Sequence, residues 1–137
     1  MTGVVVDTNV YISVLVFGGV PQRAFDLISS QGLSLYVSPS IADEVEGVLS
    51  RKFGWSPQDL ETFLPPLWER CIMIRPTIRL RVCADPDDNH VLECAAAAQA
   101  DFLITGNAKH FPKSYRTTRI VSPRQFLEML RPEAGQT

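Results

Sequence analysis

Residues 4–9 have the sequence VVVDTN, in which three valines are followed by Asp7. A continuous apolar run of this kind is typical of a parallel strand that is buried on both faces. Functional groups of open parallel sheets gather at the carboxyl ends of their strands. Asp7 is therefore predicted to stand at such an end, the alternative being a purely structural Asx turn that leads into the next helix.

Strand-like and helix-like segments alternate along the rest of the chain. Short apolar runs predict further strands at 33–37, 71–74, 102–104 and 120–121. Alternation of this type implies a parallel sheet. We therefore expect an α/β fold, with a sheet of about four to five strands and helices on both of its faces.

Three of the expected helices share one start signal, a serine followed by a proline, at Ser38, Ser56 and Ser122. Serine caps the free N–H groups of a helix, and proline suits the first helical position because its missing N–H would be unpaired there. The helix after Ser56 is predicted to end at Pro65-Pro66. Another helix is expected from Pro21 to Ser30.

The length of 137 residues fits one domain. We expect residues 1–131 to form it and residues 132–137 to be a short polar tail. The longest apolar stretch, Val10 to Phe17, is too short for a membrane span of roughly 20 residues. The N-terminus lacks the positive region of a secretory signal. These features predict a cytoplasmic protein that does not enter a membrane, and whose three cysteines are reduced.

Glu44 is unusual because it falls on an apolar helix stripe. Ile41, Val45 and Val48 define the stripe, and Glu44 lies three residues after the first and four before the last. Its neighbour Asp43 points to the polar face. A carboxylate on the core side of a helix is costly unless it is paired or bound to a metal. Glu44 is therefore a candidate ligand.

A second group of acids opens the helix that starts near Pro86. Asp85 is predicted to be its cap, with Asp88 as the capping-box partner three residues on. Acids in a first helical turn are stabilising by themselves, so capping alone is a sufficient role for Asp85. Asp88 precedes the inward-facing Val91 and Leu92 by three and four residues, which favours a site role.

Asp7, Glu44 and Asp88 come from three segments whose ends can converge on one edge of a parallel sheet. Three carboxylates brought together repel one another, and a divalent cation is the natural compensation. Ligand sets made only of oxygen favour Mg²⁺ or Mn²⁺ over zinc. His90 and His110 are too few and too scattered for a zinc cage, and surface roles are expected for both.

The charge distribution gives a weaker signal. The net charge is −2, so nucleic-acid binding cannot be inferred from the total. Basic residues nevertheless outnumber acids between 102 and 131, where Glu128 is the single acid, and a second basic stretch covers 75–81. The basic residues of the first segment are Lys109, Lys113, Arg116, Arg119, Arg124 and Arg131. A solvated surface explains them as well as RNA binding does.

Four short motifs in this order resemble a PIN domain, and the resemblance extends from Val4 to Leu130. They are Val6-Asp7-Thr8-Asn9-Val10, Ser38-Pro39 with Glu44 in one helix, Asp85-Pro86-Asp87-Asp88-Asn89, and Ala100-Asp101-Phe102-Leu103-Ile104-Thr105-Gly106. The continuation to Asn107 and Lys109-His110-Phe111-Pro112 is similar to a VapC-like subgroup of toxin components of toxin–antitoxin systems.

The resemblance implies a Rossmann-like sheet and an endoribonuclease that needs Mg²⁺ or Mn²⁺. Carried over by position, it makes Asp7, Glu44 and Asp88 the catalytic, metal-binding acids. Asn107 takes the place of a fourth aspartate, and an amide oxygen can still bind a hard cation without adding charge. The supporting polar residues are Asn9, Thr105 and Asp85.

The resemblance also bears on substrate and partners. Lys109, Lys113, Arg116 and Arg119 are expected to line an open groove for single-stranded or structured RNA. The expected partners are this RNA, a cognate antitoxin protein, and further copies of the chain in a homodimer or higher oligomer.

Other functions are weighed against this one. Because Asn107 is neutral, a degenerate PIN domain that binds RNA or a protein without cutting is the main alternative. A phosphatase that phosphorylates a strand-end aspartate would need a second acid at the position of Asn9. A receiver domain would need a paired acidic cluster near the N-terminus, which is absent.

Overall fold

A computed structural model describes residues 2–130 of the chain; Met1, Arg131 and the tail at 132–137 lie outside the described residues. Its core is a six-stranded sheet in the order β3-β2-β1-β4-β6-β5. The strands are β1 (Gly3–Val6), β2 (Ser34–Val37), β3 (Ile72–Met73), β4 (Phe102–Ile104), β5 (Ser114–Tyr115) and β6 (Thr118–Val121). All neighbouring pairs are parallel except β5 with β6, which confirms the predicted mainly parallel sheet.

The three valines form a buried parallel strand, as predicted, and this strand lies inside the sheet between β2 and β4. Val4, Val5 and Val6 each have an exposed fraction of 0%. A strand covered on both faces needs apolar side chains pointing both ways, which explains why the run does not alternate. In the register with β4, Val6 lies opposite Ile104, so the two strands end side by side.

The helices are α1 (Thr8–Val16), α2 (Val20–Ser30), α3 (Pro39–Phe53), α4 (Pro57–Glu69), α5 (Pro86–Ala98) and α6 (Pro123–Leu130), with a 3₁₀ turn η1 (Ala108–His110). The predicted serine caps are present. Ser38 Oγ accepts the N–H of Ile41, and Ser56 forms a capping box with Asp59. Ser122 Oγ accepts the N–H of Gln125. None of the helices within residues 2–130 is long and apolar enough to cross a membrane.

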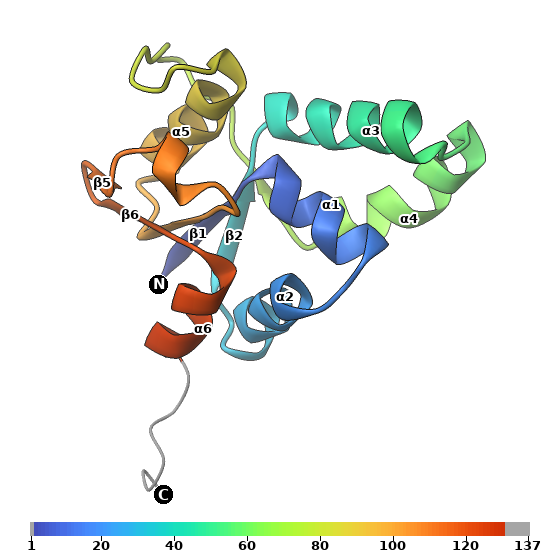
Figure 1. Cartoon of the computed structure of the whole chain (residues 1–137), viewed down its shortest axis with the longest axis horizontal. Coiled ribbons are helices and arrows are strands. Elements are labelled where there is room, and N and C mark those ends of the chain that lie inside the picture. Colours follow the sequence, from blue (N-terminus) through green and yellow to red (C-terminus); the bar gives the residue numbers. More distant parts are fainter. Residues whose placement is uncertain (1, 131–137) are drawn as a thin grey trace, which may run out of the picture.

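The order of the strands fixes where a site can form. The chain moves from β1 outward to β2 and β3, and then returns through α5 to β4 on the other side of β1. Right-handed crossovers in both directions place α5 on the opposite face of the sheet from α1 and α2 (Figure 1). The direction of winding therefore reverses between β1 and β4, and ligands of such sheets bind outside the carboxyl ends at that point.

The predicted end of a helix at Pro65-Pro66 is wrong. The α4 helix continues through both prolines to Glu69. The prolines remove the N–H groups that would bond to the carbonyls of residues 61 and 62, but this side of the helix is exposed and water can reach those carbonyls. Leu64 and Leu67 are buried on the other side, and their packing holds the helix together.

The edge strands also differ from the predicted ones. The strand expected at 71–74 is only Ile72–Met73, and both side chains are about half exposed at the end of the sheet. The antiparallel strand β5 was not predicted, because two residues carry too little periodicity to be detected. The apolar stretch from Val10 to Phe17 falls in α1 and its C-cap, where only Val10, Tyr11 and Ile12 of it are buried.

Candidate metal centre

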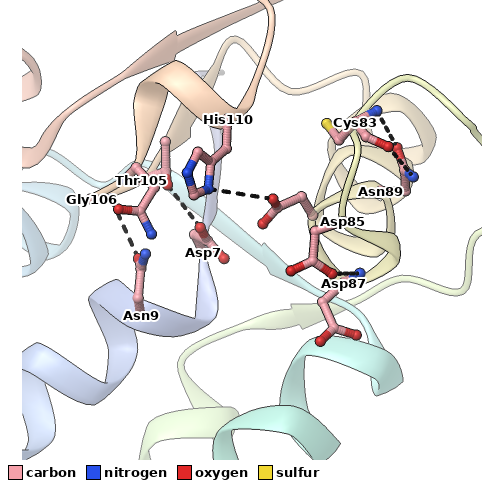
Figure 2. A network of polar contacts seen from close by, with 11 residues as sticks. Asp7, Asn9, Cys83, Asp85, Asp87, Asn89, Thr105, Gly106 and His110 are labelled. Carbon is pink, nitrogen blue, oxygen red and sulfur yellow. Dashed lines mark hydrogen bonds and ion pairs between the residues drawn. The ribbon is translucent and has the colours of Figure 1, made fainter.

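Asp7 is a buried carboxylate at the point where the winding of the sheet reverses. Its side chain is only 5% exposed. Its backbone N–H donates to the carbonyl of Ile104, so the next residue of that chain segment, Thr105, lies beside it. Thr105 Oγ1 donates a hydrogen bond of 2.7 Å to Asp7 Oδ2 (Figure 2). Asp7 occupies the N-cap position of α1, but its side chain makes no capping bond, so an Asx turn does not account for it.

The surroundings of Asp7 disfavour its charged form. Burial raises the pKa of this carboxyl from 3.8 to about 6. The hydrogen bond from Thr105 acts in the opposite direction, and the negative charges of Asp88 and Asp85 raise the pKa further. A carboxylate that is buried beside other acids is a group that a bound cation would stabilise.

Polar supports join the ends of β1 and β4. Thr105 Oγ1 also accepts the N–H of Asn107 at 3.0 Å. Asn9 Oδ1, in the first turn of α1, accepts the N–H of Gly106 at 3.3 Å (Figure 2). Thr105 and Asn9 thus hold the segment after β4 against the start of α1, and their role as supports of a metal site stays a prediction.

The start of α5 brings a second group of acids to the same place. Asp85 caps the helix as predicted, and its Oδ1 accepts the N–H of Asp87 at 2.9 Å. Asp88 is not the predicted capping-box partner; its carboxylate is directed toward His110 instead. Burial raises the pKa of Asp88, the charge of Asp85 raises it further, and His110 lowers it.

Glu44 reaches the cluster from α3. The fully buried stripe of this helix consists of Ile41, Val45 and Leu49, whereas the predicted stripe member Val48 is only partly buried. Glu44 lies half-buried at the margin of the stripe, while Asp43 is exposed as expected.

The charges around Glu44 connect it with the other acids. Burial raises the pKa of Glu44, and the charges of Asp87, Asp7, Asp85 and Asp88 raise it further, in decreasing order. Glu44 therefore belongs to the same electrostatic cluster as the carboxylates of β1 and α5.

His110 lies at the surface, as expected, but beside one of the acids. Its imidazole is 54% exposed, but Nδ1 lies 3.8 Å from Asp88 Oδ2 (Figure 2). The sequence signal was weak: His110 follows Asn107 by three residues, and only the turn of η1 directs it back toward the acids.

The donor set of the cluster suits a hard divalent cation, because its candidate ligands are carboxylate and amide oxygens. Within residues 2–130 no three His, Cys, Asp or Glu side chains stand close enough to hold one ion between them. The acids of β1, α3 and α5 are instead electrostatic neighbours. The buried position of Asp7 and the raised pKa values of Asp7, Glu44 and Asp88 fit a cation at this place.

Comparison with known proteins identifies the fold. Residues 3–109 match a family model described as the PIN domain. This chain belongs to the PIN-domain family.

Two known proteins are similar to this PIN domain, one in sequence and one in structure. An uncharacterized protein of Methanocaldococcus jannaschii is 30% identical, over 91% of this chain and 89% of its own length. In the crystal structure of VapBC2 from Rickettsia felis bound to a DNA fragment from their promoter, one chain superposes with a TM-score of 0.62. That chain is 13% identical, with 88% of this chain and 98% of the other covered, and it shows the shared fold.

Asn107 of this PIN domain lies at the expected edge of the sheet. It directly precedes η1, and its backbone N–H is held by Thr105. Its side chain is exposed. The position allows an approach to an ion near Asp7, and its role as a ligand stays a prediction.

Of the four basic residues expected to bind RNA, three line one hollow and the fourth does not. Lys109, Lys113 and Arg119 line a shallow hollow of about 780 Å³ between η1, β6 and α6, whose apolar wall includes Phe111. Arg116 is not among the lining residues; its guanidinium lies 5.4 Å from the ring centre of Tyr115. Three of the four basic residues therefore share one hollow, and a common groove for RNA stays a prediction.

Proposed function

We propose that this PIN domain is an endoribonuclease that depends on Mg²⁺ or Mn²⁺, and that it is the toxin of a toxin–antitoxin pair. The observation that carries the proposal is the buried carboxylate of Asp7, which lies at the reversal point of the sheet among the charges of Asp88, Asp85 and Glu44. An uncompensated carboxylate in that position destabilises the fold, and it is retained there for a cation.

Asp7, Glu44 and Asp88 would hold the ion, with the amide oxygen of Asn107 as an additional ligand. Because the three acids do not stand close enough to share one ion directly within residues 2–130, they would hold it partly through its bound waters. A divalent ion in such a site activates water and offsets the charge that develops on a phosphodiester. No serine, cysteine or histidine nucleophile is needed. His90 has no part in this arrangement.

The supporting residues orient these groups. The 2.7 Å hydrogen bond from Thr105 fixes one oxygen of Asp7 and leaves the other for a ligand. Asn9 holds the segment after β4 in place, and Asp85 fixes the first turn of α5 from which Asp88 projects. His110 beside Asp88 is placed to contact a phosphate that enters the site.

RNA is the substrate class that fits the surroundings. The hollow with Lys109, Lys113 and Arg119 adjoins η1, the turn that carries His110 to the acids. The positively charged side chains of this hollow can bind phosphates of a single strand or loop, next to the phosphate at which the RNA is cut. The contribution of Arg116 to RNA binding stays a prediction.

An antitoxin partner and self-association complete the proposal. The structurally similar chain comes from a structure described as VapBC2 bound to a DNA fragment from their promoter, and this supports the proposed antitoxin partner. The homodimer or higher oligomer is proposed from the resemblance to the toxins alone. Light scattering of the purified protein measures the second point directly.

A non-catalytic PIN domain is the second candidate function. The neutral Asn107 favours it, because this position then adds no charge to the cation site. Such a protein would bind RNA or a protein partner without cutting. Metal-dependent turnover separates the two candidates.

Incubation of the purified protein with bulk RNA in Mg²⁺, in Mn²⁺ and in excess chelator tests the proposal. We expect cleavage with either ion and none with chelator. RNA that is bound but stays intact under all three conditions would support the non-catalytic function.

A further inference from the structure

Thr8 carries an unexplained polar atom beside the proposed metal centre. The residue Thr8 is only 5% exposed. Among the buried side-chain nitrogen and oxygen atoms of residues 2–130, Thr8 Oγ1 is the one without a hydrogen-bond partner. A buried hydroxyl without a partner destabilises a fold, and nearly all such groups in proteins are paired. Its retention therefore points to a partner that arrives with a ligand.

The position of Thr8 indicates which ligand this is. Thr8 directly follows Asp7, the buried acid of this centre. Together with Asn9 it lines a shallow hollow of about 370 Å³ between α1 and α3, and Glu44 stands on the α3 wall of the same hollow. Thr8 is thus the chain neighbour of one proposed metal-binding acid, Asp7, and borders the same hollow as another, Glu44.

We propose that Thr8 is a positioning residue whose hydroxyl hydrogen bonds to the hydration shell of a divalent cation held at Asp7. The inference rests on the proposed function, because it assumes a cation at this centre. Mg²⁺ gives up its waters reluctantly and usually keeps several of them in proteins. Those waters need hydrogen-bond partners, and groups of this kind orient an ion and raise its affinity.

Thr8→Val tests the inference because valine keeps the shape of threonine and removes the hydroxyl. In the absence of metal this variant is expected to melt at a higher temperature than the wild type, since an unpartnered hydroxyl is lost. Its affinity for Mg²⁺ in a calorimetric titration is expected to fall by roughly 10–100-fold. Thr8→Ser keeps the hydroxyl and is expected to bind Mg²⁺ as the wild type does.

Thr118→Val is the matched control. Thr118 is 2% exposed, and its Oγ1 donates a 2.6 Å hydrogen bond to the carbonyl of Ala100, at the opposite end of the sheet strands from Asp7. The same substitution there is expected to lower the melting temperature and to leave Mg²⁺ affinity unchanged.

Each outcome decides the matter. Equal Mg²⁺ affinities of wild type and Thr8→Val overturn the role of Thr8 and leave the proposed function standing. An affinity loss that Thr118→Val reproduces, or a lower melting temperature of Thr8→Val without metal, also overturns it. If Thr8→Val does not fold, Thr8→Ala serves with the same readouts. A wild type that binds neither Mg²⁺ nor Mn²⁺ overturns both this inference and the metal basis of the proposed function.

Discussion

Replacing Asp7 by asparagine is expected to stabilise the metal-free protein at neutral and alkaline pH. The pKa of Asp7 is raised from 3.8 to about 6 in the folded chain. One pKa unit corresponds to about 1.4 kcal/mol, so the ionised carboxylate lowers the free energy of unfolding by about 3 kcal/mol above pH 6. Asparagine has the same shape, stays neutral, and can accept the hydrogen bond from Thr105.

The gain should depend on pH in one direction. Below about pH 4 the carboxyl is protonated in both the folded and the unfolded chain, so it has no effect on stability. Between about pH 4 and 6 the folded chain binds the proton more tightly, and the wild type loses stability as the pH rises. Asp7→Asn removes this loss, and its advantage therefore grows through that window and is constant above it.

Urea unfolding in excess chelator, measured from about pH 4 to pH 8, provides the assay. Asp43→Asn is the control, because this exposed acid of α3 should change stability by no more than about 0.5 kcal/mol. Mg²⁺ at about 100 times its Kd should then stabilise the wild type by about 2.7 kcal/mol and leave Asp7→Asn unchanged. An Asp7→Asn protein that is less stable than the wild type at pH 8 would refute the reasoning, as would a difference that does not vary with pH.

Three further outcomes are expected. Glu44→Gln should abolish RNA cleavage while the exposed Asp43→Asn leaves it nearly intact; equal losses in a gel assay would show that the helix face is misassigned. Asn107→Asp should tighten Mg²⁺ binding by about ten-fold or more, because an added charge near a dication is worth roughly several kcal/mol before desolvation. Identical Mg²⁺ affinities of the wild type and Asn107→Asp in calorimetry would place Asn107 outside the ligand set. Lys109→Gln should weaken RNA binding and reduce the slope of the logarithm of affinity against the logarithm of salt concentration by about 0.7, whereas Arg23→Gln on α2 should do neither. Equal slopes for the wild type and Lys109→Gln in a filter-binding assay would argue against RNA binding in the hollow.

Much of the fold follows from local sequence signals. The all-valine run predicted a strand that is buried on both faces, and the serine–proline pairs predicted three helix starts, because both depend on neighbouring residues alone. Local signals gave a wrong prediction where tertiary packing determines how far a helix extends. Burial of Leu64 and Leu67 carries α4 through two prolines that local rules treat as a helix end.

The candidate site follows from local signals only in part. Glu44 was singled out because a carboxylate beside a buried stripe conflicts with the helix pattern, although the stripe runs through Leu49 and not Val48. His110 could not be found in this way, since its approach to Asp88 depends on how η1 folds back after β4. The separation of Arg116 from the hollow likewise depends on the turn between β5 and β6, where its φ is +53°.

The metal dependence of RNA cleavage by Asp7 variants tests the central claim most directly. The rate of cleavage of a single-stranded RNA would be measured against Mn²⁺ concentration for the wild type, Asp7→Asn and Asp43→Asn. Saturable, chelator-sensitive cleavage is expected for the wild type and Asp43→Asn, and none for Asp7→Asn at any Mn²⁺ concentration. Wild-type cleavage that persists unchanged in excess chelator, or an Asp7→Asn protein as active as the wild type, would contradict a cation held at Asp7.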